Sequence, residues 1–97
     1  MELDWDPAKN EANLQKHGIS FEEAKHIFDG PFLTRADDRR DYGESRDITL
    51  GALSPDGVIV VVHTERDDKI RLISARKANR RERTPYHDHL AQAQGGD

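Results

Sequence analysis

Apolar side chains in the first thirty residues recur at helical spacing between recognisable start and stop signals. The start and stop signals predict a helix over residues 7–17, because Asp6 can cap its first turn and Gly18 can adopt the left-handed conformation that ends a helix. A serine and a glutamate spaced as a capping box then open a second helix, over residues 20–29. Its apolar face is formed by Phe21, Ala24, Ile27 and Phe28.

Beyond residue 30 the spacing of the apolar residues changes from helical to alternating, which is typical of strands. Four strands are predicted, at residues 31–37, 46–53, 58–66 and 69–77. Short polar links join the last three of them, including the turn sequence SPDG, and such links favour an antiparallel meander. Residues 3–5 are read either as a short strand or as an extended lead-in.

Residues 78–93 form the last candidate helix. We expect a break near Thr84–Pro85, because the residue before a proline avoids helical angles. The order of elements predicts an α+β domain, with two N-terminal helices packed on one face of a four-stranded antiparallel sheet and a short C-terminal helix. The other face of the sheet is left to solvent or to a partner. Residues 1–91 are expected to form this single domain, and residues 92–97 a frayed polar tail.

Composition places the chain among small soluble proteins. Of its 97 residues, 34% are hydrophobic and 35% are charged, and none is cysteine, which fits a reducing cytoplasm. The sequence shows neither a secretory leader nor an apolar run long enough to cross a membrane, so no membrane association is expected. Our expectation is therefore a cytoplasmic protein.

The formal net charge of -4 conceals an uneven distribution. Residues 66–83 carry eight Lys and Arg side chains against three acidic ones, whereas residues 1–65 carry seven against fourteen. A local positive block can hold an anionic partner, because salt screens charges more than about 10 Å away. A second interpretation remains open, in which the block is a solvated face whose arginines pair with nearby carboxylates such as Glu82.

Arginines within this block have the chemistry of a phosphate site, since a guanidinium group can bind phosphate bidentately and stays charged. Arg71 and Arg76 lie five residues apart, so in a strand without a bulge they point to opposite faces. Arg80 and Arg83 share one side of the final helix.

Other catalytic patterns are weak or missing. His63 interrupts an apolar strand and is either a general acid or base, or a structural histidine hydrogen-bonded to a neighbour. Two histidines flank Asp88, but their spacing makes them diverge on a helix, so no metal site is expected. The sequence has no phosphate-binding glycine loop, serine-hydrolase motif or cysteine nucleophile. RNA cleavage requires none of these motifs, because RNA supplies its own nucleophile in the 2′-hydroxyl group.

Two segments carry a resemblance to a known family: WDPAKNEANLQKHGISFEEAKHIFDGP, and later HTERDDKIRLISARKANRRER. Together they resemble the BrnT family of type II toxins, also called DUF497, over residues 3–86. The resemblance implies a RelE-like fold and a ribonuclease that stops translation. It also implies a neutralising antitoxin of the BrnA type, and contact with DNA only through that antitoxin.

The leading hypothesis is a metal-independent RNA endonuclease that needs no cofactor. Its predicted catalytic residues are Glu44, His63, Arg76 and Arg80, the first two as a general acid–base pair brought together by neighbouring strands. Its predicted RNA-binding residues are Lys16, His17, Arg46, Arg71, Arg81 and Arg83, although Lys16 and His17 are also explained by their place at a helix end. The alternative is a non-catalytic binding module whose basic patch docks RNA or an acidic protein.

Overall fold

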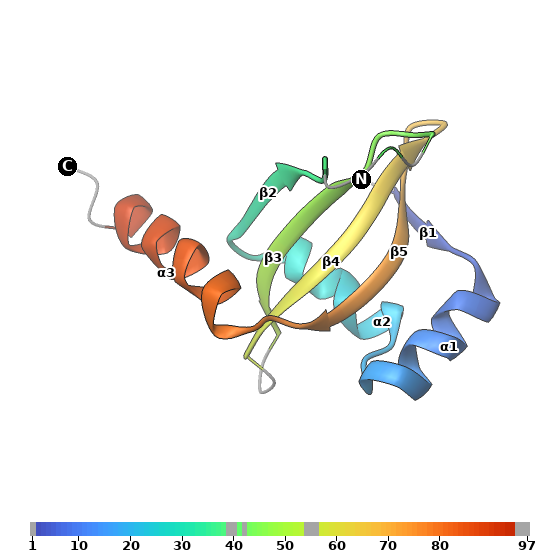
Figure 1. The fold of residues 1–97 in the computed structure, drawn as a ribbon, viewed down its shortest axis with the longest axis horizontal. Helices are drawn as coiled ribbons and strands as arrows, with labels where there is room; N and C mark the ends of the chain where they lie inside the picture. The colour runs from blue at the N-terminus through green and yellow to red at the C-terminus, as the bar shows by residue number, and fades with distance from the viewer. Residues whose placement is uncertain (1, 39–40, 42, 54–56, 95–97) are drawn as a thin grey trace.

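The computed structural model describes residues 2–38, 41, 43–53 and 57–94. The chain forms an α+β fold in which strands and helices follow in the order β1, α1, α2, η1, β2, β3, β4, β5, α3 (Figure 1). Their bounds are β1 Glu2–Trp5, α1 Pro7–His17, α2 Phe21–Ala24, η1 Lys25–Asp29, β2 Phe32–Ala36, β3 Asp47–Leu53, β4 Gly57–Arg66, β5 Lys69–Lys77 and α3 Arg80–Gln94.

The sheet has five strands, in the order β1-β5-β4-β3-β2, and is mixed. Strands β2 to β5 form the expected antiparallel meander. The prediction of a four-stranded antiparallel sheet is wrong in one strand, because β1 pairs with β5 in parallel, with Leu3 opposite Ile70. Short links between neighbouring segments reveal hairpins, whereas the partner of β1 lies more than sixty residues away in sequence.

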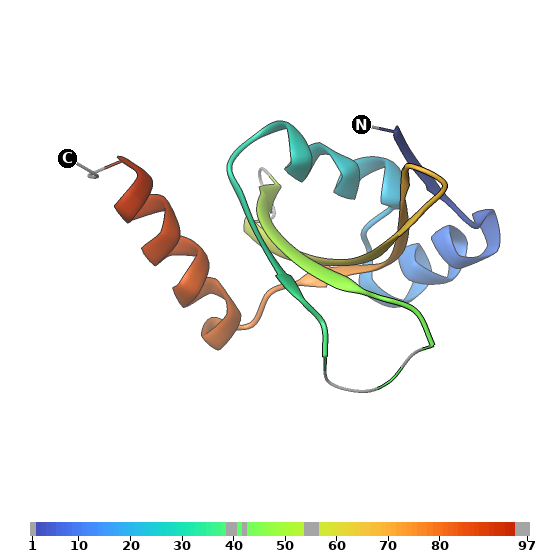
Figure 2. The same ribbon diagram turned by 90° about the horizontal axis from the view of Figure 1, so that it is seen from above.

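Local capping signals set the start of both N-terminal helices. Asp6 accepts a hydrogen bond from the amide of Ala8, and Gly18 ends α1 at φ 73°. The capping box at Ser20 opens α2 as predicted, but after one turn the segment continues as the 3₁₀ helix η1. The strands curve around α2 and η1, so the main core lies between these two helices and one face of the sheet (Figure 2).

Helix α1 lies along the edge of β5 instead of over the sheet, which corrects the predicted pair of helices on one face. The buried side chain of Asn13 replaces a strand here: its Nδ2 donates to the carbonyl oxygen of Ala75 at 2.8 Å, and its Oδ1 accepts from the Ala75 amide at 3.0 Å. Since β1 pairs with β5 only as far as Leu72, these backbone groups would otherwise be unsatisfied at the sheet edge. One asparagine thus fixes α1 to β5.

Helix α3 is continuous through Pro85, so the predicted break near Thr84 is wrong. The helix start is held by a capping box between Asn79 and Glu82, with both hydrogen bonds at 2.9 Å. The Tyr86 ring is buried, and its hydroxyl donates to the carbonyl oxygen of Pro31 at 3.1 Å. These contacts on both sides of the proline offset the single backbone hydrogen bond that it removes.

The sheet face opposite α2 and η1 is partly covered, which corrects the expectation of a bare face. Tyr86 packs there against Ile48, Leu50, Val58 and Val60. Beyond this contact α3 projects away from the sheet, at the end of the molecule opposite α1 (Figure 1). The helix runs to Gln94, and the remainder of the predicted tail, residues 95–97, lies outside the described residues.

Candidate nucleic-acid interface

A β-bulge brings two of the predicted arginines to the same face of the sheet. The register between β4 and β5 shifts at Val62/His63, so that Arg76 pairs with Val60 and Arg71 pairs with Thr64. Cross-strand partners share a face, and residues 60 and 64 of one strand also share a face. The two arginines therefore point to the face that carries Tyr86, where an unbulged strand would have separated them. We call this side of the sheet the arginine face.

Arg76 lies at the junction of β5 and α3 and is held there by Glu82. Its two terminal nitrogens donate to the two carboxylate oxygens at 2.8 and 2.6 Å, a bidentate contact. The hydrogen bond from Arg76 lowers the pKa of Glu82, and partial burial of the carboxylate opposes this shift. The hydrogen bond from the Asn79 amide also lowers this pKa. The guanidinium is thus oriented by the residue that also caps α3, and about a third of its side chain stays exposed, at 36%.

The first turn of α3 carries Arg80, Arg81 and Arg83, all exposed. Within the described part of the chain these three form no ion pair, whereas Arg71 contacts Asp4 at 3.5 Å and Arg76 contacts Glu82. A helix N-terminus already has positive partial charge, and each added cation there opposes stability by about 0.3–1 kcal/mol. This arrangement favours anion binding over helix stability.

Both interpretations of the basic block therefore hold for part of it. In its strand half, Arg71 and Arg76 pair with carboxylates, as the solvated-face interpretation expects. In its helix half, no arginine pairs with a carboxylate of the described residues. Glu82 both pairs with Arg76 and caps α3. The capping-box spacing of Asn79 and Glu82 is the signal in the sequence for the capping role. A cavity of about 400 Å³ beside the junction adds Arg35, which no sequence pattern had singled out; it is lined by Leu33, Arg35, Leu50, Arg81, Glu82 and Pro85.

The structure does not bring Glu44 and His63 together as an acid–base pair. His63 lies on the helix-covered face, opposite the arginine face, with only 5% of its surface exposed. Its Nε2 lies 2.7 Å from the hydroxyl of Thr49, and Phe28 packs edge-on against its ring. Burial lowers the pKa of His63, opposed by the charge of Asp47.

Glu44 instead forms ion pairs with two arginines. It contacts Arg66 at 2.9 Å and Arg46 at 3.6 Å, and the hydrogen bond from Arg66 is the main cause that lowers its pKa. A carboxylate so paired is a weaker base than a free one. The predicted acid–base pair is thus replaced by two separate structural contacts.

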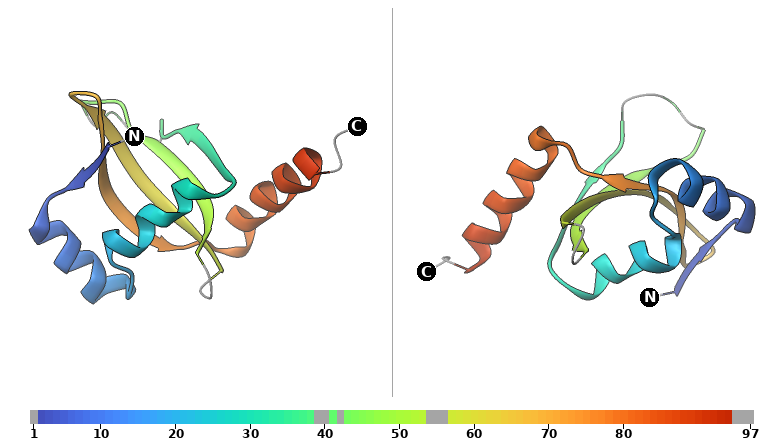
Figure 3. Two further views of the ribbon diagram at one scale, coloured as in Figure 1. Left: turned by 180° about the vertical axis from the view of Figure 1, so that it is seen from behind. Right: turned by 90° about the horizontal axis from the view of Figure 1, so that it is seen from below.

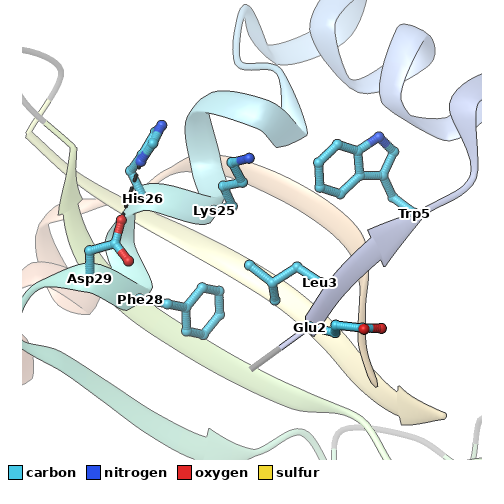
Figure 4. Close-up of a pocket in the computed structure, with 7 residues that line it drawn as sticks. All are labelled: Glu2, Leu3, Trp5, Lys25, His26, Phe28 and Asp29. Carbon is cyan, nitrogen blue, oxygen red and sulfur yellow. Dashed lines mark hydrogen bonds and ion pairs between the residues drawn. The ribbon is translucent and has the colours of Figure 1, made fainter. Parts of the chain in front are cut away.

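The predicted RNA-binding residues Lys16, His17 and Arg46 do converge. They line one groove between α1 and the arginine face, although they come from segments thirty residues apart. A larger cavity, of about 620 Å³, is lined by none of the predicted residues. It lies between β1 and η1 and is lined by Glu2, Leu3, Trp5, Lys25, His26, Phe28 and Asp29 (Figure 4).

Among the described residues, no group of three or more histidine or acidic side chains is arranged to hold a metal ion. Nor is any described helix long and apolar enough to cross a membrane.

The protein thus has a small α+β fold, and arginines cluster where β5 meets α3. The family model described as "Ribonuclease toxin, BrnT, of type II toxin-antitoxin system" matches residues 5–82. The chain therefore belongs to the BrnT family of ribonuclease toxins, which confirms the toxin function expected from the sequence. Membership in this family also implies an antitoxin partner and an RNA substrate.

A solved structure shares the fold. The crystal structure of the Brucella abortus ribonuclease toxin BrnT superposes with a TM-score of 0.61 at 20% sequence identity, covering 82% of this chain and 99% of that one. At this identity the likeness concerns the fold alone. No curated protein matches the chain.

Proposed function

We propose that this toxin is a metal-independent RNA endonuclease that binds the scissile phosphate at the junction of β5 and α3. The observation that carries the proposal is the junction itself. It sets the oriented guanidinium of Arg76 beside a helix N-terminus that bears Arg80 and Arg83 without ion-pair partners among the described residues. Arg81 and Arg71 extend this positive surface to either side and are assigned to flanking nucleotides.

The reaction proposed is attack by the substrate's own 2′-hydroxyl. Its oxygen forms a bond to phosphorus while the bond to the 5′-oxygen breaks, which leaves a 2′,3′-cyclic phosphate. The 2′-hydroxyl proton passes to solvent, and solvent returns one proton to the leaving 5′-oxygen. The arginines stabilise the charge that builds on the phosphoryl oxygens, an effect typically worth about 2–4 kcal/mol per donor.

The proposal gives no proton-transfer role to Glu44 or His63. Both side chains are engaged elsewhere, Glu44 with arginines and His63 under Phe28. Positioning of the 2′-hydroxyl in line with the leaving oxygen then supplies the rest of the rate enhancement. An enzyme of this kind is slow, but a toxin needs few turnovers for each message.

We assign the antitoxin to the BrnA type, with contact to DNA only through it, and place the action of the toxin on translation in the cytoplasm. The exposed arginines of α3 support an acidic contact from the partner, because covering them with carboxylates would also block RNA phosphates. The junction of β5 and α3 is thus the proposed active site and also the surface that we assign to the antitoxin.

The test is incubation of purified toxin with 5′-labelled RNA in excess chelator. We expect cleavage that survives chelation and leaves 2′,3′-cyclic phosphate ends, and no cleavage of the same RNA methylated at every 2′-oxygen. Cleavage abolished by chelation would refute metal independence. Tight binding with intact RNA under every condition would support the non-catalytic binding module instead.

A further inference from the structure

A groove of about 420 Å³ separates α1 from the arginine face of the sheet. Helix α1 contributes one stripe of side chains, at positions 9, 12, 13, 16 and 17, and the sheet side contributes residues 73 and 74 of β5 and the residue just before β3. The lining residues are Lys9, Ala12, Asn13, Lys16, His17, Arg46, Ile73 and Ser74. Because Asn13 is bonded to the backbone of β5, the two walls of the groove are fixed relative to each other.

The lining of the groove is cationic. Lys9, Lys16 and Arg46 supply three positive charges, and among the described residues no aspartate or glutamate lines the groove. Glu44 lies beside the lining, with its Oε2 3.6 Å from Nε of Arg46. Cations that converge on a concave surface raise the local concentration of anions.

Helix stability accounts for only part of this charge. The position of Lys16 in the last turn of α1 is favoured by the helix dipole, but Lys9 occupies the third position of the first turn, which contains no acidic residue. A positive charge there opposes the dipole and is unfavourable by a few tenths of a kcal/mol. The lysine is therefore explained better by a ligand than by the helix.

The groove lies close to the proposed scissile-phosphate site. Ser74, in its wall, precedes Arg76 by two residues on β5, and the pairing of these residues with Val62 and Val60 puts both on the arginine face. Two residues of strand span roughly 7 Å. The phosphates of a stacked nucleic-acid strand recur about every 3.4 Å along its axis, so one RNA chain can reach both sites within a few nucleotides.

We propose that this groove binds a phosphodiester of the RNA backbone next to the cleaved one. The ammonium groups of Lys9 and Lys16 and the guanidinium of Arg46 hold its non-bridging oxygens, with the hydroxyl of Ser74 as a further donor. This inference rests on the proposed function and adds to it a second, non-catalytic phosphate subsite. The subsite anchors the substrate, so its loss raises KM and leaves kcat unchanged.

The experiment measures binding with an RNA that cannot be cleaved, in which every 2′-oxygen is methylated and the 5′ end is fluorescent. We compare the double variant Lys9→Gln/Lys16→Gln with Lys25→Gln/Lys69→Gln, which changes the net charge equally outside both the groove and the junction. The groove variant should bind roughly tenfold more weakly. Its slope of log affinity against log salt should be smaller by about 0.7 for each phosphate that the protein no longer neutralises, whereas the control pair keeps the wild-type slope.

Binding to methylated RNA does not depend on catalysis, so failure of the proposed endonuclease would appear only in the separate cleavage assay. Equal RNA affinity and equal salt slope in the two double variants would overturn the phosphate subsite. A groove variant that keeps its RNA affinity but no longer binds the purified antitoxin would also overturn it, by assigning the groove to the protein partner. Unchanged thermal unfolding of both variants, measured alongside, confirms that the fold is intact.

Discussion

The two faces of the sheet treat their polar side chains in opposite ways. On the face covered by α2 and η1, polar groups are buried and paired with each other: the Thr49 hydroxyl lies 2.7 Å from both His63 Nε2 and the Thr34 hydroxyl. On the arginine face, apolar packing is confined to the patch around Tyr86, and the guanidinium of Arg76 stays partly exposed. The ribbon makes the same division visible, because α2 and η1 cover the sheet on one side only (Figure 3).

This contrast explains why two residues predicted to be catalytic lie in different environments. His63 interrupts an apolar strand and Arg76 belongs to the basic block, so both were candidates from the sequence. A neutral imidazole can be buried if it finds a hydrogen-bond partner, whereas a guanidinium stays charged and must keep contact with a carboxylate or with water. The face covered by α2 and η1 therefore holds the histidine, and the arginine face holds the arginines.

The largest effect is expected on stability, from removing a buried side chain on the face covered by α2 and η1. Phe21 is fully buried there, packed edge-on against Trp5 with ring centroids 6.1 Å apart. Phe21→Ala should lower the free energy of unfolding by about 3–5 kcal/mol, measured by urea denaturation. Leu14→Ala, at a residue that is 40% exposed, is the matched control and should change stability far less. Equal losses in the two variants would contradict the assignment of the core to this face.

The second-largest effect is expected on catalysis, from removing a guanidinium group on the arginine face. Arg76→Ala should reduce the rate of RNA cleavage by about 10²–10³-fold, because the variant has no charged donor at that position for the developing phosphoryl charge. The measurement is single-turnover cleavage of labelled RNA by the folded variant.

Glu82→Gln separates this role from a structural one, since it removes the same ion pair but keeps the guanidinium. If Arg76 acts on the phosphate, Arg76→Ala is much the more damaging change. Equal rate losses in the two variants would show that Arg76 matters only by holding α3.

The smallest effect is a pH dependence of stability that comes from His63, on the face covered by α2 and η1. Burial lowers the pKa of His63 below its ordinary value of 6.5, so the unfolded chain binds the proton more readily. Stability should therefore fall as the pH drops below 6.5, by at most about 1.4 kcal/mol per pH unit, until the folded-state pKa is reached. Urea midpoints between pH 5 and 8 should show this loss in the wild type and less of it in His63→Gln. A cleavage pH profile that loses its near-neutral limb in His63→Gln would instead restore this histidine to the mechanism.

Local signals in the sequence were sufficient for much of the fold. The start of α1 at Asp6, its end at Gly18 and the capping box of α2 depend on neighbouring residues, and all three are present in the structure. The antiparallel meander followed from short polar links. The break predicted at Pro85 failed because the proline signal is local, whereas the burial of Tyr86 that holds α3 is not.

By itself the sequence determined which elements form, where the positive charge gathers along the chain, and the resemblance to the BrnT family. Only the tertiary structure decided which side chains meet. The parallel pairing of β1 with β5, the bulge that aligns Arg71 with Arg76, and the bond of Asn13 to Ala75 all join segments distant in sequence or depend on a one-residue shift of register. Such pairings are set by the packing of the whole chain, since a single inserted residue in a strand reverses the face of every side chain after it.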